Sequence, residues 1–182
     1  MKRKIYVLLI AVSLQLVVNA QSKVQFENHN QVGLLAGSSL PALQLQTVNG
    51  VKYKTFFLGA GIGSDGYYSK SMPLFAELRK YIFQKKETPF VYVDAGSNIS
   101  SEEDVKTTWS TTTYHSGLYY DVGIGYQWKI ARRFHIDASF GFSQKKYGYK
   151  QQYLAGAGGT EVAPQTYDYR LQRFTMKLGL GF

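Results

Sequence analysis

Cysteine is absent from the 182 residues of the chain, and proline is scarce, with 4 residues. The absence of cysteine excludes a disulfide scaffold, a cysteine-ligated metal centre and a cysteine nucleophile. Charged residues make up only 18% of the chain, whereas aromatic residues reach 15%. A chain so poor in charge and so rich in aromatic residues is not intrinsically disordered, and its length suits a single domain.

Long hydrophobic runs are also missing. Beyond residue 20, no segment approaches the ~18 unbroken apolar residues that indicate a membrane-spanning helix. A shorter run, Ile5 to Val18, follows Lys2-Arg3-Lys4 and leads into Val18-Asn19-Ala20. A basic start, a short apolar run and small residues at the cleavage positions predict a secretory signal peptide over residues 1–20. The mature protein is then one domain, residues 21–182.

The charge balance is basic, with 21 lysines and arginines against 12 aspartates and glutamates. Removal of residues 1–20 takes away three basic residues and leaves 18 against 12. The basic residues occur in scattered pairs rather than in a dense stripe, so we expect no nucleic-acid partner. For an exported protein, the expected counterpart is the anionic headgroups of membrane lipids.

Period-two alternation dominates the chain from residue 30 onward, which is typical of strands with two different faces. It is clearest over 118–129, 134–145 and 173–182, where apolar side chains occupy one parity and polar or glycine residues the other. The apolar parity of these segments includes Leu118, Val122, Ile124, Ile136, Phe140, Phe174, Leu178 and Leu180. No charge interrupts this parity over ~10 residues, the length that a tilted membrane strand needs, so we expect these side chains to face lipid.

Eight strands are expected, over about 30–38, 41–48, 51–64, 69–83, 89–98, 114–130, 133–149 and 166–182. Short connections, among them a hairpin turn at Asn49-Gly50, alternate with longer ones at 64–69, 99–113 and 150–165. An even number of antiparallel strands, with short turns at one end and long loops at the other, is typical of membrane barrels. The predicted fold class is all-β, an eight-stranded antiparallel up-and-down transmembrane β-barrel.

The polar parity is expected to line the barrel interior. It carries glycines, which make room inside a narrow barrel, and charges of both signs, which can pair when enclosed together. The expected lumenal charge network consists of Glu77, Arg79, Asp94, Asp121, Asp137, Arg173 and Lys177. The alternative is a soluble, lipocalin-like barrel that turns its apolar parity inward to bind an apolar ligand. Glycine on the outside of such a barrel would only weaken its strands, which favours the membrane barrel.

The C-terminal sequence adds a family resemblance to this pattern. With the signal peptide and the eight alternating strands, Met176-Lys-Leu-Gly-Leu-Gly-Phe182 resembles the small OmpA/OmpX-type outer-membrane β-barrels of Gram-negative bacteria. The resemblance implies a location in the bacterial outer membrane, with the short turns in the periplasm and the long loops at the cell surface. It also implies that Phe182 belongs to the signal that hands such chains to the outer-membrane assembly machinery. It implies no reaction.

Binding motifs for cofactors and metals are weak. Gly61-Ile-Gly63-Ser-Asp-Gly66 matches the dinucleotide-binding pattern, but a strand rather than a helix is expected after it, so we expect no cofactor. The three histidines, His29, His115 and His135, are widely spread and lack the spacing of metal ligands. No metal site is expected.

Catalytic residues are not expected either. His115 lies at the expected outer rim beside Ser116, and Asp121 follows on the same strand. Neighbouring strand residues point to opposite faces, and Asp121 is roughly 20 Å away along an extended strand, so the three cannot act together. A rim-site enzyme that acts on lipid or peptide stays the alternative.

The expected function is that of a non-enzymatic outer-membrane barrel with a structural or interaction role: surface recognition, membrane stabilisation, or service as an accessory subunit of a larger outer-membrane complex. An eight-stranded barrel has an interior just wide enough for side chains, so we expect no passive pore. The expected partners are outer-membrane lipids and a protein bound through the loops at 99–113 and 150–165, which carry Tyr, Trp, Ser and Thr.

Overall fold

The computed structural model describes residues 24–38, 40–67, 70–100, 104–107, 110–131, 133–153 and 163–182. The predicted signal peptide lies outside these ranges and stays a prediction. Among the described residues, no helix is long and apolar enough to cross a membrane.

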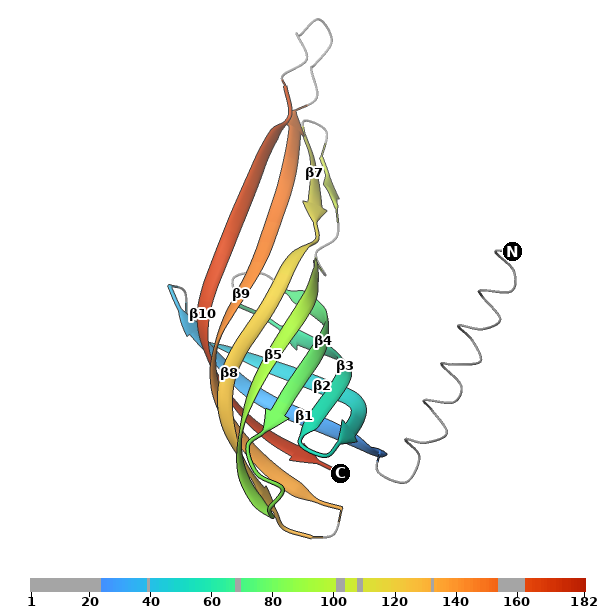
Figure 1. Ribbon diagram of the computed structural model, residues 1–182. Coiled ribbons are helices and arrows are strands. Elements are labelled where there is room, and N and C mark those ends of the chain that lie inside the picture. The colour runs from blue at the N-terminus through green and yellow to red at the C-terminus, as the bar shows by residue number, and fades with distance from the viewer. Residues whose placement is uncertain are drawn as a thin grey trace, which may run out of the picture.

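Antiparallel strands account for nearly all of the described chain. They are β1 (Val24–Gly37), β2 (Ala42–Tyr53), β3 (Phe56–Asp65), β4 (Ser71–Tyr81), β5 (Glu87–Ser100), β6 (Val105–Lys106), β7 (Ser110–His115), β8 (Gly117–Lys129), β9 (His135–Tyr153) and β10 (Gln165–Gly181). The sheet runs in the order β10-β1-β2-β3-β4-β5-β8-β9, and β9 pairs again with β10 (Figure 1). These eight strands therefore close into an antiparallel barrel, which confirms the predicted fold class.

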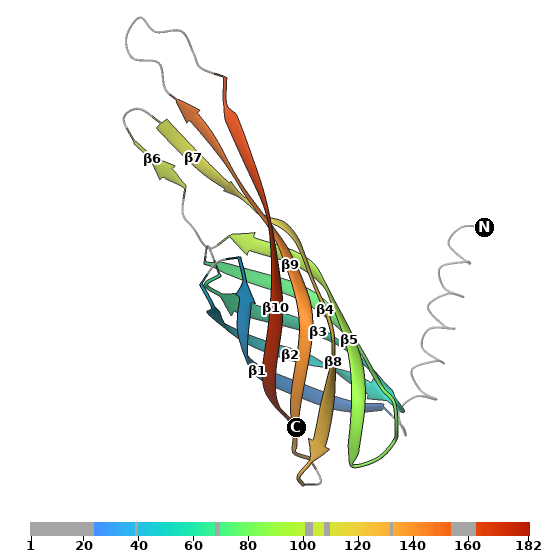
Figure 2. The same ribbon diagram turned by 90° about the vertical axis from the view of Figure 1, so that its left-hand side faces the viewer.

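The two ends of the barrel differ. The connections at 54–55 and 82–86, the end of β8 and the start of β9 lie at the same end as Val24 and Phe182, which we call the terminal end. At the other end, called the far end, the sheet continues beyond the barrel as β6, β7, residues 146–153 of β9 and residues 165–172 of β10 (Figure 2). We call this part the sheet extension. It includes parts of the predicted 99–113 and 150–165 loops, while residues 101–103, 108–109 and 154–162 lie outside the described chain.

The first two strands and the turn between β2 and β3 differ from the prediction. β1 and β2 are both longer than the predicted strands 30–38 and 41–48, and the predicted Asn49-Gly50 turn is wrong, because both residues lie inside β2. The turn falls at Lys54-Thr55, where Lys54 has the left-handed φ of 56° found in tight hairpin turns. A Cβ atom at Gly50 would lie 2.5 Å from the Cα atom of Gly59 in β3. Glycine at position 50 thus permits close strand approach rather than a turn.

The alternation along the strands separates two environments. One parity points into the barrel and is buried, and the other points outward and exposes large apolar side chains. Ile124 and Leu178 on the outside are 63% and 66% exposed, whereas Asp121 and Lys145 on the inside are fully buried. This arrangement is the reverse of a soluble barrel, which keeps its apolar side chains inside.

Candidate functional site

The residues predicted to form the lumenal network and the lipid-facing surface lie on opposite faces of the barrel wall. Glu77, Arg79, Asp94, Asp121, Asp137, Arg173 and Lys177 are inside, each at most 3% exposed. Leu118, Val122, Ile124, Ile136, Phe140, Phe174, Leu178 and Leu180 are outside, between 37% and 66% exposed. The inner set forms charged groups at three levels between the far end and the terminal end.

The group nearest the far end centres on Asp65. Lys145 Nζ lies 2.5 Å from Asp65 Oδ1, and Arg173 Nη1 donates to Asp65 Oδ2 at 3.1 Å. Lys145 Nζ also donates to Ser71 Oγ at 2.8 Å. Asp65 falls within the predicted 64–69 connection, and this is why the predicted network lacks it. The structure places it as the last residue of β3, with its side chain turned into the barrel.

The middle group centres on Lys177. Its Nζ atom donates to Asp121 Oδ2 at 3.1 Å and to Asp94 Oδ2 at 3.5 Å. Tyr92 donates from its hydroxyl to Asp121 Oδ1 at 3.0 Å, and the ammonium group of Lys177 lies 4.3 Å from the centre of the Tyr92 ring. One lysine therefore contacts two buried carboxyl groups, whose burial would be more costly without it.

The group at the terminal end contains Arg79 and two histidines. Arg79 Nε donates to Glu77 Oε1 at 2.7 Å, and Arg79 Nη1 lies 3.4 Å from Asp137 Oδ2. His29 Nδ1 lies 3.2 Å from His135 Nε2 and 3.4 Å from Asp137 Oδ2. The group borders a cavity of about 610 Å³ that opens at the terminal end, with His135 among its lining residues.

His29, His135 and Asp137 are candidate metal ligands, because one ligand atom from each lies within 4.8 Å of the others. His29 and His135 lie far apart in the sequence. Barrel closure places them in β1 and β9, the two strands that flank β10, and each lies opposite Gly181. Arg79 Nη1, however, lies 3.4 Å from both His29 Nδ1 and Asp137 Oδ2. A guanidinium cation already occupies the place beside these ligand atoms, so the geometry is that of an arginine-centred hydrogen-bond network rather than a metal centre.

Aromatic side chains fill the space between the charged groups. Fully or almost fully buried rings include Phe57, Phe75, Tyr81, Phe90, Tyr92 and Tyr119. Such packing of charged pairs and rings is that of a filled small barrel, whose interior has room for side chains and little else.

The predicted rim residues are not brought together. Asp121 points into the barrel and bonds to Tyr92 and Lys177, whereas His115 is exposed at the end of β7. His115, Ser116 and Asp168 do line one shallow hollow of about 410 Å³ at the far end. No hydrogen bond joins these three side chains in the part of the chain that the structure describes. A nucleophile and its base must lie within hydrogen-bond reach, so the hollow lacks a catalytic pair.

Tyrosines form the main feature of the sheet extension. Strand register aligns Tyr114, Tyr149 and Tyr167 in one row across β7, β9 and β10, and Tyr147 and Tyr169 in the next row. The rings of Tyr149 and Tyr167 stack with centres 4.9 Å apart and planes 25° apart. All five rings lie on the face that continues the inner wall of the barrel. We call them the tyrosine face.

An apolar cluster at the far end of the barrel continues into the tyrosine face. It consists of Leu35, Tyr67, Tyr147 and Leu171, with Tyr114, Tyr149 and Tyr169 packed against it. The guanidinium of Arg173 lies 5.4 Å from the centre of the Tyr67 ring, which joins this cluster to the charged group below. The tyrosine face therefore rests on a packed base.

Phe182 lies at the opposite end. Its backbone exchanges two hydrogen bonds with Asn28, at 2.8 and 3.0 Å, and its ring lies 6.3 Å from that of Phe134 on the outer surface. This placement completes the pairing of the last strand with the first. The predicted role of Phe182 as an assembly signal stays a prediction.

Comparison with protein-family models and with curated protein sequences finds no match. Three solved structures share the fold. Neisserial surface protein A is 10% identical, with a TM-score of 0.56 over 87% of this chain and 95% of its own. The N-terminal β-barrel domain of Pseudomonas aeruginosa OprF is 9% identical, with a TM-score of 0.54 over 88% and 98%.

The third is the outer-membrane protein AlkL, which is 11% identical, with a TM-score of 0.50 over 88% of this chain and 89% of its own. At these identities the likeness concerns the fold alone. The closed eight-stranded barrel, its charged interior and its apolar outer surface agree with that likeness. The chain has the fold of the small bacterial outer-membrane β-barrels, and its outer surface suits the same membrane.

Proposed function

We propose that the protein is a non-enzymatic outer-membrane barrel that recognises a protein partner at the cell surface through its tyrosine face. In this arrangement, residues 1–20 direct export, the terminal end faces the periplasm and the sheet extension stands outside the cell. The observation that carries the proposal is the row of tyrosine rings held above the membrane barrel on three paired strands.

The tyrosine face has the features of a contact surface. Tyrosine offers a large rigid ring and a hydroxyl at little entropic cost, and it is enriched where proteins bind one another. Tyr149 and Tyr169 are half-buried against their neighbours, so their rings are already ordered, while Tyr167 is 37% exposed. These side chains then lose less conformational entropy when a partner binds.

Transport and catalysis are less well supported. The three charged groups and the buried rings occupy the interior that a solute would need to cross. The interior carboxylates are engaged by lysine or arginine, and the described part of the chain contains no acid or nucleophile hydrogen-bonded to His115. An interaction role requires neither an open pore nor a reactive group.

Site-specific photo-crosslinking in intact cells tests this proposal. A photo-reactive phenylalanine analogue placed at position 167 presents its ring on the tyrosine face, and the same analogue at position 166 presents it on the opposite face of β10. We expect a protein adduct of discrete mass at position 167, lost when Tyr149→Ser and Tyr169→Ser are added. Position 166 supplies the matched control.

No adduct at position 167, or the same adducts at both positions, would overturn the proposed surface-recognition role. Retention of each variant in the outer-membrane fraction is measured in the same cells. A protein that is absent from that fraction would contradict the membrane location itself, which separates the two failures.

A further inference from the structure

A compact polar patch interrupts the apolar outer surface of the barrel. The outward parity of β1 and β2 places Asn28 opposite Asn49 and Asn30 opposite Thr47. Asn30 and Asn49 are exposed, and Asn28 is covered by its neighbours. We call these four residues the asparagine patch.

Apolar residues surround the asparagine patch on every side. Phe26 and Val51 precede it toward the terminal end, and Val32 and Leu45 follow it toward the far end. The neighbours across the sheet are Leu180 in β10 and Ala60 and Ile62 in β3. The patch therefore lies within the apolar surface rather than at its edge. In this position, its amide groups meet hydrocarbon, which offers no hydrogen-bond partners, unless another molecule covers them.

The hydrogen bonds within the patch satisfy only part of it. Asn30 Nδ2 donates to Asn28 Oδ1 at 2.5 Å, and Asn28 Nδ2 donates to Asn49 Oδ1 at 2.7 Å. This chain of bonds ends in an acceptor, Asn30 Oδ1, and a donor, Asn49 Nδ2, neither of which has a partner among the described residues. An amide always carries both a donor and an acceptor, so the patch presents both kinds of group outward.

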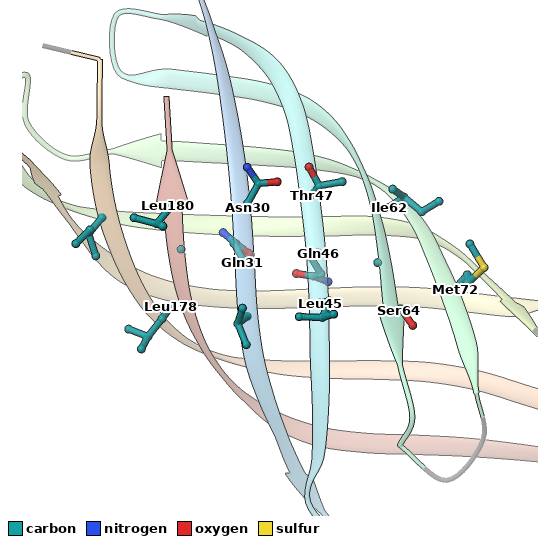
Figure 3. A pocket seen from close by; sticks show the side chains of 14 residues that line it. Asn30, Gln31, Leu45, Gln46, Thr47, Ile62, Ser64, Met72, Leu178 and Leu180 are labelled. Atoms are coloured by element: carbon teal, nitrogen blue, oxygen red, sulfur yellow. The ribbon is translucent and has the colours of Figure 1, made fainter. Parts of the chain in front are cut away.

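An apolar hollow of about 850 Å³ borders the patch on the same outer face. Asn30 and Thr47 lie at one side of it, with Leu45 and Ile62 beside them (Figure 3). The other large apolar side chains that line it are Val32, Met72, Ile136, Leu178 and Leu180. The face thus combines unsatisfied amides with an apolar recess.

We propose that this face binds a second copy of the same chain in a twofold dimer. The proposal rests on the membrane location of the barrel. The occupant must donate a hydrogen bond to Asn30 and accept one from Asn49. The acyl chains that would otherwise cover this part of the wall can do neither.

A second copy supplies both missing groups. A twofold axis through the patch brings Asn49 of the second copy toward Asn30, and the reciprocal contact forms on the other side of the axis. Two amide hydrogen bonds then form in place of four unsatisfied groups. The apolar residues that border the patch in one copy can fill the recess in the other, so polar and apolar parts of the face are satisfied together.

The absence of cysteine allows a direct test by oxidative crosslinking of the full-length protein in native outer membranes. Thr47→Cys places a thiol in the patch, opposite Asn30, and keeps Asn30 and Asn49, whose amides form the proposed contact. Val93→Cys is the matched control, because Val93 points outward from β5 on the opposite side of the barrel. We expect a disulfide-linked dimer with Thr47→Cys, at least about tenfold more abundant than with Val93→Cys. Equal yields would overturn the proposal.

A second measurement uses the charge-neutral variant Asn28→Leu/Asn30→Leu/Asn49→Leu and native mass spectrometry of protein released from membranes. We expect wild-type dimers and variant monomers, with both proteins retained in the membrane and both resistant to SDS before boiling. A dimer that persists in the variant would overturn the proposal, as would a wild-type monomer that carries bound lipid. If neither protein were retained in the membrane, the proposed location would fail instead.

Discussion

His29 Nδ1 and His135 Nε2 lie 3.2 Å apart, although 106 residues separate them in the sequence. The contact exists because β10 lies between β1 and β9, with Gly181 opposite both histidines. A Cβ atom at Gly181 would overlap the ring of His135. The glycine therefore makes room for the histidine pair at the point where the barrel closes.

The substitution Gly181→Ala is expected to destabilise the folded barrel by about 1–3 kcal/mol, because the added methyl group overpacks the histidine pair. Urea titration in lipid vesicles, read by the gel mobility of unboiled protein, measures the change. Gly66→Ala is the control, since a Cβ atom there has no neighbour within 4 Å. Adding His135→Ala to Gly181→Ala should recover part of the loss, and the absence of any recovery would contradict the steric explanation.

Replacement of Lys177 is expected to lower the unfolding free energy by more than Gly181→Ala does. Lys177→Met leaves Asp94 and Asp121 buried without their shared cation, and the expected loss is about 3–5 kcal/mol of unfolding free energy. The same urea titration applies. Lys146→Met, at an exposed position, should change stability by less than about 0.5 kcal/mol. The triple change Lys177→Met/Asp94→Asn/Asp121→Asn should restore much of the loss, and a single variant as stable as the wild type would count against the network.

The loss of stability caused by a charged substitution on the outer surface should depend on the depth of the residue in the bilayer. Ile124→Arg places a charge near the middle of β8 and is expected to cost about 2–4 kcal/mol, whereas Trp128→Arg near the terminal end should cost about 1 kcal/mol or less. Refolding yield and urea midpoint in vesicles report the difference. Equal costs at the two positions would show that the outer surface does not face lipid.

The rim histidine should prove dispensable for lipid chemistry. His115 is exposed and has no hydrogen bond to Ser116 or Asp168 within the described chain, so His115→Ala should leave the lipid composition of the outer membrane unchanged. Mass spectrometry of extracted lipids compares the wild type, the variant and a strain without the protein. A lipid modification found with the wild type, but not with the variant or without the protein, would support the alternative of a rim-site enzyme.

The closed barrel was predictable because each strand repeats the same two-residue period, as in the run from Leu118 to Lys129. The turn between β2 and β3 was not, because Asn49-Gly50 is a strong local turn signal. Pairing of Asn49 with Asn28, and of Gly50 with Gly59, extends β2 past this signal. Tertiary pairing there outweighs local preference.

The site was predictable only where one strand's parity decides the direction of a side chain. That rule placed Asp121 and Lys177 on the polar parity, but it says nothing of Asp65, which the sequence assigned to a connection. The contact between His29 and His135 depends on which strands become neighbours at closure, and no local pattern encodes it. Only part of the sheet extension was predicted. The expected strands 133–149 and 166–182 reach into it, but most of β7 was assigned to the 99–113 loop, because its Ser- and Thr-rich sequence has no apolar parity.

The exchange of backbone hydrogen bonds between Phe182 and Asn28 has a consequence for biogenesis. Until the final strand arrives, the free edge of β1 has no partner for its amide and carbonyl groups, and hydrocarbon offers none. Insertion strand by strand would expose that edge to lipid. Closure of β1 against β10 must therefore accompany insertion, so that the edge of β1 is paired when it enters the hydrocarbon.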